Sequence, residues 1–370
     1  LGYGAILDEV TEPNESIAVP NSFFHTNFRL DSDGETLFLS SNNETILDSI
    51  NVIELETDMS FGRQNESSDW GLFSEPTPGI SNSNFSYEGS LSTPELSLES
   101  GFYDSNQLLI ELESNHDEAS IHFTLDGSPP TPSDLEYEYP ITLNSSTVVR
   151  ARSFMDGWVK SNITTKTYLF NEDIPSELPA IFITTDPNSF FDPDTGMYMM
   201  GPNADTWNFP YFGANFWEDW ERPIHFEILE VDGTGYDADA GAKIFGGWSR
   251  AFPQKSMSIF SRSHIGPSVF EYKLFPSSDI EKYESFVLRN SGNDWESTIL
   301  RDGFTTSLTN DLDIDHQRYR PAILYINGEF WGIQNIREKV SEHFISSNHS
   351  ISSEHIDLLD IEGVNDENVV

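Results

Sequence analysis

The stretch IHFEILEVDG, residues 224–233, decides the fold of the C-terminal half of the chain. Apolar and polar side chains alternate along Ile224–Val231 and an Asp-Gly pair follows, so the pattern predicts a β-strand that ends in a tight turn. Upstream, the apolar run Ala180–Ile183 predicts a buried strand. Downstream, two apolar sets recur at helical spacing, and the mixture predicts an α+β domain over residues 176–370. These two sets are Ile299, Leu300, Phe304 and Leu308, and Ile336, Val340 and Phe344.

The region before this domain contains only strand and turn signals. Residues 1–83 hold short alternating runs such as Ile46–Ile53, which predict a β-sandwich. Residues 92–170 predict a second one, with the strand Ile121–Leu125 ahead of an Asp-Gly turn. We therefore expect a multidomain chain: two all-β immunoglobulin-like sandwiches followed by the α+β domain.

The composition is strongly acidic. The 370 residues include 62 Asp and Glu against 19 Lys and Arg, a net charge of -43, while 37% hydrophobic residues supply enough apolar surface for real cores. Such a charge repels nucleic acid, so we expect no nucleic-acid partner, and salt would screen the self-repulsion in a marine or halophilic source. No apolar run approaches 18 residues, which predicts no membrane span. The absence of Cys excludes disulfides and Cys nucleophiles.

The scarce positive charge is concentrated in one region. Twelve of the 19 basic residues lie between positions 243 and 339, which suggests an anionic ligand there, most simply a phosphate. These residues are Lys243, Arg250, Lys255, Arg262, Lys273, Lys282, Arg289, Arg301, Arg318, Arg320, Arg337 and Lys339.

The same region carries six short blocks in a recognisable order. They are ERP (221–223), GGWSR with PQKS (246–256), LRNSGNDW (288–295), LRD (300–302), YINGEFWGI (325–333) and REK (337–339). The series resembles the CotH (spore coat protein H) kinase family. Residues 1–83 resemble a lamin-tail domain, through blocks such as Phe28–Leu30 and Ser60–Arg63, and residues 92–170 resemble the chitobiase C-terminal domain. Together these resemblances imply a secreted or cell-surface bacterial protein whose third domain is atypical-kinase-like.

Lys255 is the best candidate for binding phosphate, because it lies in an apolar strand, with Met257 and Ile259, just after a Gly-containing turn. The resemblance implies that it contacts nucleotide phosphates and pairs with an acidic residue on a later helix, for which we choose Glu338. Arg250 and Arg301 are candidates to clamp phosphate oxygens. The alternatives are that Lys255 is a solvent-exposed strand residue, that Glu338 is an ordinary surface residue of a helix, and that both arginines form structural ion pairs.

Other polar clusters have simpler explanations. Asn290, Asn293 and Asp294 suit a Gly-containing turn, and Asp302 suits the start of a helix. The acidic runs 192–196 and 232–239 contain calcium-type ligands but lack EF-hand spacing, so turn-forming loops are the better interpretation. We expect no metal ligand among these residues. No zinc motif and no Gly-x-Ser-x-Gly elbow is present.

The CotH resemblance implies that the magnesium-binding and catalytic aspartates follow residue 370. We therefore expect ATP and Mg as cofactors only of a complete domain, leave the catalytic residues unknown, and expect residues 1–370 alone to be inactive. Two hypotheses remain open. One is an atypical protein kinase acting on secreted or surface proteins; the other is a surface adhesion or structural protein with a degenerate kinase-like domain. The β modules are expected to contact other surface proteins or glycans.

Overall fold

The computed structural model describes residues 34–42, 45–52, 55, 59–64, 69–77, 80–82, 86–170, 177–309, 312, 314–349 and 351–358. The chain forms two compact units. The first contains residues 1–93, 115–120 and 153–162, and the second contains residues 94–114, 121–152 and 163–370. No helix in the described part of the chain has the length and apolar character needed to cross a membrane.

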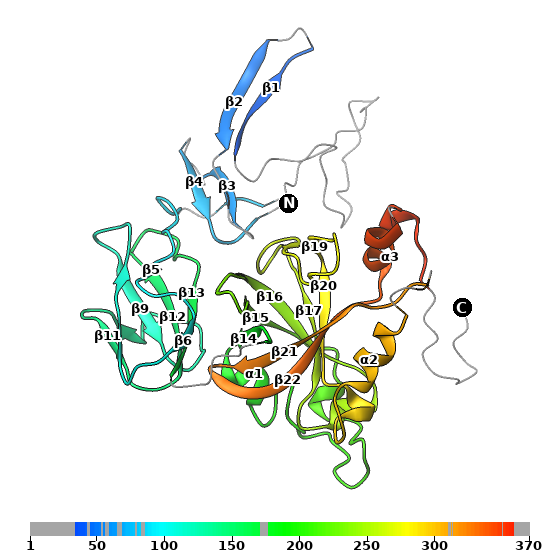
Figure 1. Ribbon diagram of the computed structural model, residues 1–370. Helices are drawn as coiled ribbons and strands as arrows, with labels where there is room; N and C mark the ends of the chain where they lie inside the picture. Colours follow the sequence, from blue (N-terminus) through cyan, green and yellow to red (C-terminus); the bar gives the residue numbers. More distant parts are fainter. Residues whose placement is uncertain are drawn as a thin grey trace. The chain divides into compact units, whose positions relative to one another are not determined.

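The first unit contains two antiparallel hairpins (Figure 1). Strand β1 (Glu35–Ser40) pairs with β2 (Ile46–Val52), and β3 (Ser60–Arg63) pairs with β4 (Trp70–Phe73). The strand expected at residues 46–53 is therefore present over its described residues. The block Phe28–Leu30 lies outside the described residues, so the lamin-tail resemblance stays a prediction.

Residues 95–170 form several small sheets, as expected for a β-sandwich module. A five-stranded sheet has the order β10-β9-β12-β13-β6, and the pairs β11-β7 and β5-β8 accompany it. Side chains such as Ile110, Ile121, Val149 and Tyr168 form its core. The immunoglobulin-like assignment stays a prediction. The strand bounds are β5 Glu95–Leu96, β6 Gly101–Tyr103, β7 Leu108–Ile110, β8 Leu112–Glu113, β9 Ser120–Thr124, β10 Leu135–Glu136, β11 Ile141–Leu143, β12 Thr147–Phe154 and β13 Thr164–Phe170.

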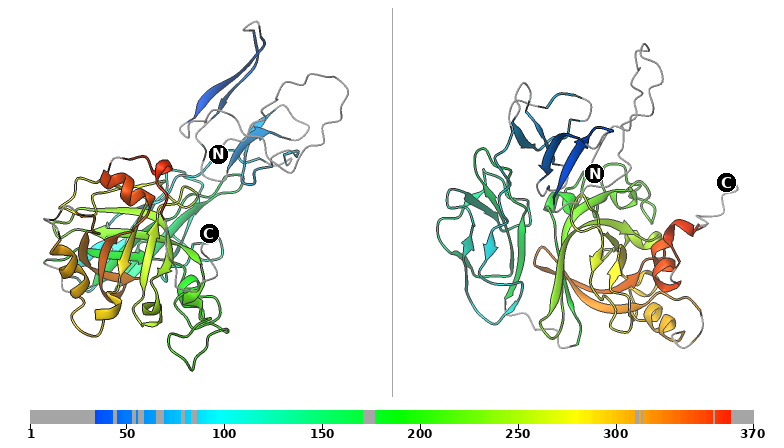
Figure 2. Two further views of the ribbon diagram at one scale, coloured as in Figure 1. Left: turned by 90° about the vertical axis from the view of Figure 1, so that its right-hand side faces the viewer. Right: turned by 90° about the horizontal axis from the view of Figure 1, so that it is seen from above.

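The C-terminal region is built on a closed barrel of seven strands, in the order β14-β15-β16-β17-β20-β22-β21 (Figures 1 and 2). Closure leaves these strands without a free edge. A two-stranded sheet of β18 and β19 accompanies it. The bounds are β14 Ala180–Thr184, β15 Glu221–Leu229, β16 Gly235–Phe245, β17 Ser256–Phe260, β18 Phe270–Glu271, β19 Lys282–Tyr283, β20 Ser285–Arg289, β21 Tyr319–Ile326 and β22 Glu329–Glu338.

The barrel core explains the apolar patterns of the sequence. Ile181 and Ile183 of β14 belong to the main core, while Phe182 packs in a second cluster with Leu169 and Tyr325, so β14 is buried on both faces as predicted. The predicted strand at residues 224–231 lies within β15 and its turn, which confirms that prediction. The core is filled by Ile181, Ile183, Phe226, Ile228, Ile244, Met257, Ile259, Phe286, Leu288, Leu324, Ile326 and Ile336.

The helical content of the C-terminal region is lower than the predicted α+β domain implied. The described residues contain the short α-helices α1 (Pro187–Phe191), α2 (Arg301–Ser307) and α3 (Glu342–His349), and Figure 1 shows α2 and α3 outside the barrel wall. A Cβ at Gly303 would lie 2.3 Å from the ring of Tyr319, so α2 packs closely on β21. Four short 3₁₀ helices are η1 Asn215–Trp217, η2 Trp248–Ala251, η3 Gly292–Asp294 and η4 Ser353–His355.

Both predicted helical stripes need correction. The helix at residue 301 exists, but Leu300, Phe304 and Leu308 are all more than half exposed, so this stripe does not face the core. The stripe through Ile336 is wrong, because residues 329–338 are strand β22 and the helix starts only at residue 342.

The turn that produces β22 explains the second error. Asn327 and Gly328 both have positive φ, at 49° and 79°, as a tight two-residue hairpin turn requires. Chain reversal at this turn pairs β22 with β21 along its whole length and so precludes a helix there.

The sandwich and the barrel do not share a sheet. Strand β13 ends at residue 170 in the five-stranded sheet, and β14 begins at residue 180 in the barrel. A continuous sheet across residue 175, which would have contradicted separate modules, is not formed by these strands. The domain boundaries themselves stay predictions.

Candidate functional site

Lys255 lies immediately before β17, and its side chain is buried, with 4% of the residue exposed. Its Nζ donates hydrogen bonds to the carbonyl oxygens of Arg250, at 2.6 Å, and Phe252, at 3.0 Å. These carbonyls end the 3₁₀ turn η2, whose last groups lack partners within the helix. Lys255 therefore caps this turn, and the interpretation of a solvent-exposed lysine is wrong.

Aromatic rings surround the same ammonium group. Lys255 Nζ lies 4.0 Å from the ring centroid of Phe216 and 5.7 Å from that of Tyr198. Among the described residues no carboxylate pairs with it. Burial alone lowers the pKa of Lys255 to about 8, because no nearby negative charge offsets the loss of water. The side chain is thus a desolvated cation that lacks a counter-charge.

Arg250 belongs to the same loop as Lys255. Its Nε donates to the Gly246 carbonyl, its Nη1 donates to the Phe216 carbonyl at 3.4 Å, and its guanidinium lies 5.4 Å from the ring centroid of Trp217. Gly246 has a φ of 104°, which a residue with a Cβ rarely adopts. The structure therefore brings Arg250 and Lys255 together on one glycine-dependent loop, residues 246–255.

A polar network fixes the base of this loop. Asn290 donates to the Gln254 carbonyl at 2.6 Å and accepts from the Ser256 hydroxyl at 2.9 Å. Gln254 donates to the carbonyls of Trp331 and Ile333 and accepts from the indole of Trp295. Gln254 belongs to the PQKS block of the sequence, and the structure shows that it ties the loop to β22.

Glu338 does not pair with Lys255, contrary to expectation. It is the last residue of β22, and its carboxylate accepts from the Arg318 backbone N–H at 2.8 Å and from Arg318 Nη1 at 2.7 Å. Strand register explains the separation, since Glu338 pairs with Phe286, which pairs with Ile259 at the far end of β17 from Lys255. No motif or spacing in the sequence indicated Arg318 as the partner.

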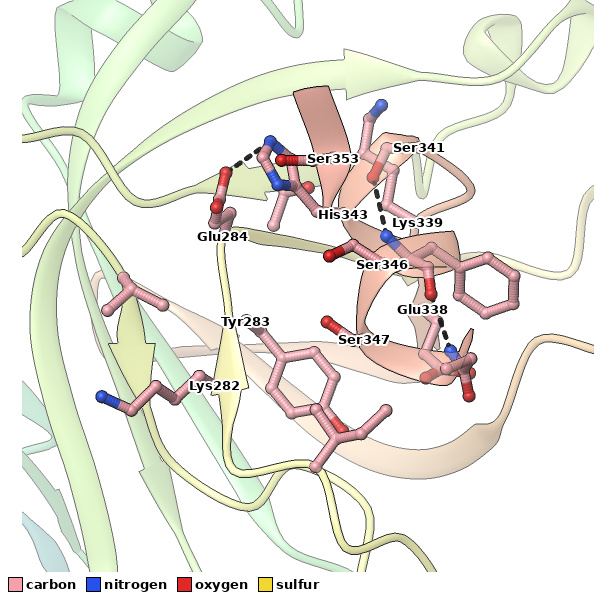
Figure 3. Close-up of a pocket in the computed structure, with 15 residues that line it drawn as sticks. Lys282, Tyr283, Glu284, Glu338, Lys339, Ser341, His343, Ser346, Ser347 and Ser353 are labelled. Atoms are coloured by element: carbon pink, nitrogen blue, oxygen red, sulfur yellow. Dashed lines mark hydrogen bonds and ion pairs between the residues drawn. The ribbon is translucent and has the colours of Figure 1, made fainter. Parts of the chain in front are cut away.

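Glu338 instead lines a cavity of about 330 Å³ beside α3 (Figure 3). In Figure 3 the His343 imidazole pairs with Glu284 at 2.6 Å, and the hydroxyls of Ser346 and Ser347 are drawn on the adjacent helix. Burial, followed by the nearby Glu338 charge, raises the pKa of Tyr283 to about 12. The lining includes neither Lys255 nor Arg250, so the predicted site residues are divided between two places.

Arg301 is two-thirds exposed and lies 3.2 Å from Asp294. Asp294 also accepts from the Thr298 hydroxyl and from the Arg301 backbone N–H, and these bonds lower its pKa. Asp302 binds both Arg289 and Arg337 at 2.7 Å. The surroundings of Arg301 are therefore a local turn, and its role as a phosphate clamp stays a prediction.

The acidic loops form local turns. Asp192 accepts from the backbone and hydroxyl of Thr195, and Asp232 does the same for Thr234. Within the described ranges, no three side chains from His, Asp and Glu converge as a metal site would require. Both loops thus match the turn-forming interpretation.

Comparison with known proteins identifies two parts of the chain. Residues 242–369 match the family model "CotH kinase protein", and residues 98–165 match the "Chitobiase/beta-hexosaminidase C-terminal domain". The CotH and chitobiase resemblances are confirmed. The CotH match contains Arg250, Lys255, Arg301 and Glu338. A search of curated proteins returns no match.

Proposed function

We propose that this polypeptide is a CotH-type atypical protein kinase of the cell surface or extracellular space, which transfers phosphate from ATP to secreted or surface proteins. The observation that supports this most directly is Lys255, a buried ammonium group without a carboxylate partner on a glycine-dependent loop inside the CotH-matching segment. The chitobiase-like module is compatible with an extracellular location.

A buried, uncompensated cation favours an anionic ligand. Removing an ammonium group from water costs several kcal/mol, and carbonyl dipoles and ring faces offset only part of this cost. A phosphate oxygen would supply the missing negative charge through a charge-assisted hydrogen bond. In this proposal the phosphate displaces the carbonyls of Arg250 or Phe252 from Lys255 Nζ, and the loop 246–255 rearranges around the ligand.

The residues present fit the phosphates better than the metal. Lys255 and Arg250 would hold the phosphates, and CotH kinases in general imply use of ATP with Mg. The described residues offer no converging set of carboxylates for Mg, so we derive no step through the metal.

A non-catalytic surface protein with a degenerate kinase-like domain is the second candidate function. The observation that favours it is the pairing of Glu338 with Arg318, because active kinases commonly fix their phosphate-binding lysine with a glutamate. Here that lysine is held by main-chain carbonyls instead.

ATP binding tests the proposal. Lys255→Met keeps the apolar stem and removes the charge, and it should weaken ATP binding at least about tenfold, as loss of a charged hydrogen bond predicts. Lys282→Met removes an exposed lysine paired with Glu271 and should leave binding unchanged. The measurement is calorimetry on the chain and on a longer polypeptide that carries it. Absence of ATP binding by the longer polypeptide, or equal affinity in Lys255→Met, would favour the non-catalytic candidate.

A further inference from the structure

A row of exposed and partly exposed aromatic side chains lies on the Lys255 loop and next to it. Phe209 contacts Trp248, with ring centroids 6.0 Å apart, and stacks on Phe252 at 6.1 Å. Phe252 in turn stacks on Trp295 at 5.6 Å. Trp248 is 62% exposed and Phe209 is 47% exposed. We call these four residues, with the neighbouring Trp207, the aromatic surface.

The loop that supplies Trp207 and Phe209 is ordered by its own contacts. Trp207, 93% exposed, is positioned by a turn in which its backbone N–H donates to Asp205 and the Asn208 amide donates to the same carboxylate. The Trp217 indole donates to the Pro210 carbonyl at 2.9 Å. Exposure of Trp207 and Phe209 is therefore built into a defined loop, and exposed apolar patches of this kind mark interaction sites.

The composition of this loop is unusual. Residues 201–220 contain seven aromatic residues and three carboxylates but no Lys or Arg. The carboxylates are Asp205, Glu218 and Asp219, of which Asp219 pairs with Lys243. Hydrogen bonds from Asn208 and from Trp207 lower the pKa of Asp205, so that it stays charged at neutral pH. The aromatic surface thus has a negatively charged carboxylate, that of Asp205, beside Trp207.

Buried and partly buried rings of the same loop already contact cations of this protein. Arg222 lies 4.8 Å from the ring centroid of Trp220, Arg250 lies 5.4 Å from Trp217, and Lys255 lies 4.0 Å from Phe216. In the described part of the chain, no such cation lies over Trp207, Phe209 or Trp248. The exposed rings therefore offer the same chemistry to an external cation.

We propose that the aromatic surface docks a lysine- or arginine-rich segment of a partner protein. Cations bind favourably over Trp and Phe faces, and the net charge of -43 attracts a basic partner and steers its encounter. Aromatic anchors ringed by polar groups are also typical of protein interfaces. This docking does not require phosphoryl transfer, so it can hold whether or not the chain is a kinase.

The test separates ring contacts from general attraction to an acidic protein. The probe is a fluorescent peptide of five Gly-Lys repeats, and its fully acetylated form is the neutral control. Binding is measured by anisotropy at about 0.3 M salt, where long-range attraction is largely screened. We expect the charged peptide to bind and the acetylated one to bind at least tenfold more weakly.

Substitutions test whether the lysine peptide binds at the aromatic surface. Trp207→Ala combined with Phe209→Ala should weaken binding about fivefold or more. Phe304→Ala removes an exposed ring on α2, outside the aromatic surface, and should leave affinity unchanged. Trp207 is almost fully exposed, so its single variant keeps the test valid if the double variant unfolds. Equal affinity of all variants would overturn the proposal, as would aromatic-dependent binding of chito-oligosaccharides without binding of the lysine peptide.

Discussion

Lys255 and Glu338 are both buried charges within the CotH-matching segment, yet only one of them has a partner of opposite charge. Glu338 has a full counter-charge, because Arg318 binds it through both a guanidinium and a backbone N–H. Lys255 has only carbonyl oxygens and ring faces. A buried charge with its partner present is a structural element, whereas one without a partner is the place where a ligand can contribute most.

The same contrast applies to the other cations of the region. At least eight of the twelve basic residues between 243 and 339 pair with carboxylates, so most of this charge concentration serves ion pairs around the barrel. The pairs involve Lys243, Arg262, Lys282, Arg289, Arg301, Arg318, Arg320 and Arg337. Charge concentration alone therefore did not identify a phosphate site, and burial without a partner distinguishes Lys255 from the rest.

Breaking the ion pair between Glu338 and Arg318 should have the largest effect on stability. Glu338→Ala leaves Arg318, only a quarter exposed, without its carboxylate, and should lower the free energy of unfolding by about 3 kcal/mol. Lys282→Ala breaks an exposed pair with Glu271 and should cost less than about 1 kcal/mol. Urea denaturation followed by Trp fluorescence measures both.

A second, isosteric variant of Glu338 sharpens the comparison with Lys255. If Glu338 is purely structural, Glu338→Gln should leave ATP affinity unchanged in the protein that remains folded. A loss of ATP affinity equal to that of Lys255→Met would show that the two residues act together after all.

The uncompensated charge of Lys255 should make the stability of the protein depend on pH. The pKa of Lys255 is about 8 in the folded state and about 10.5 when unfolded, so between these values the unfolded state binds more protons and stability rises with pH. Wild type should therefore gain about 2 kcal/mol relative to Lys255→Met between pH 7 and 9.5. Comparison with the variant cancels the contributions of groups that the two proteins share. A constant difference between the two proteins would mean that Lys255 already has a counter-charge.

Some strands of the barrel could be predicted from the sequence, where local signals were unambiguous, but the barrel itself was not predicted. The run Ala180–Ile183 and the alternating stretch with its Asp-Gly turn both became the expected strands. The prediction of a helix through Ile336 was wrong because residues 334–338 of β22 are buried on both faces. Burial on both faces hides the two-residue period of a strand. The Asn327-Gly328 pair was the better signal, since it favours a hairpin and would have placed Ile336 on a strand.

The site was less predictable than the fold. Lys255 and Arg250 are close in sequence, so local spacing sufficed to place them together. Glu338 is joined to its partner Arg318 through the pairing of β21 with β22, and no spacing rule gives that contact. The aromatic surface likewise joins residues 207–209 to residues 248–295 through tertiary packing.

The smallest effect on stability and ATP affinity is expected for Arg301→Ala. This variant distinguishes two roles of Arg301: clamping a phosphate, or stabilising a local turn. Its side chain is 67% exposed, and Asp294 keeps its bonds to the Thr298 hydroxyl and to the Arg301 backbone when the guanidinium is removed. Arg301→Ala should therefore leave the urea midpoint and the ATP affinity unchanged within error, because an exposed and screened pair contributes little. Arg250→Ala is the matched variant, since Arg250 shares the loop of Lys255 and should weaken ATP binding if that loop holds the phosphates. A tenfold loss of ATP affinity in Arg301→Ala with an unchanged midpoint would extend the phosphate site to α2 and contradict the local-turn interpretation.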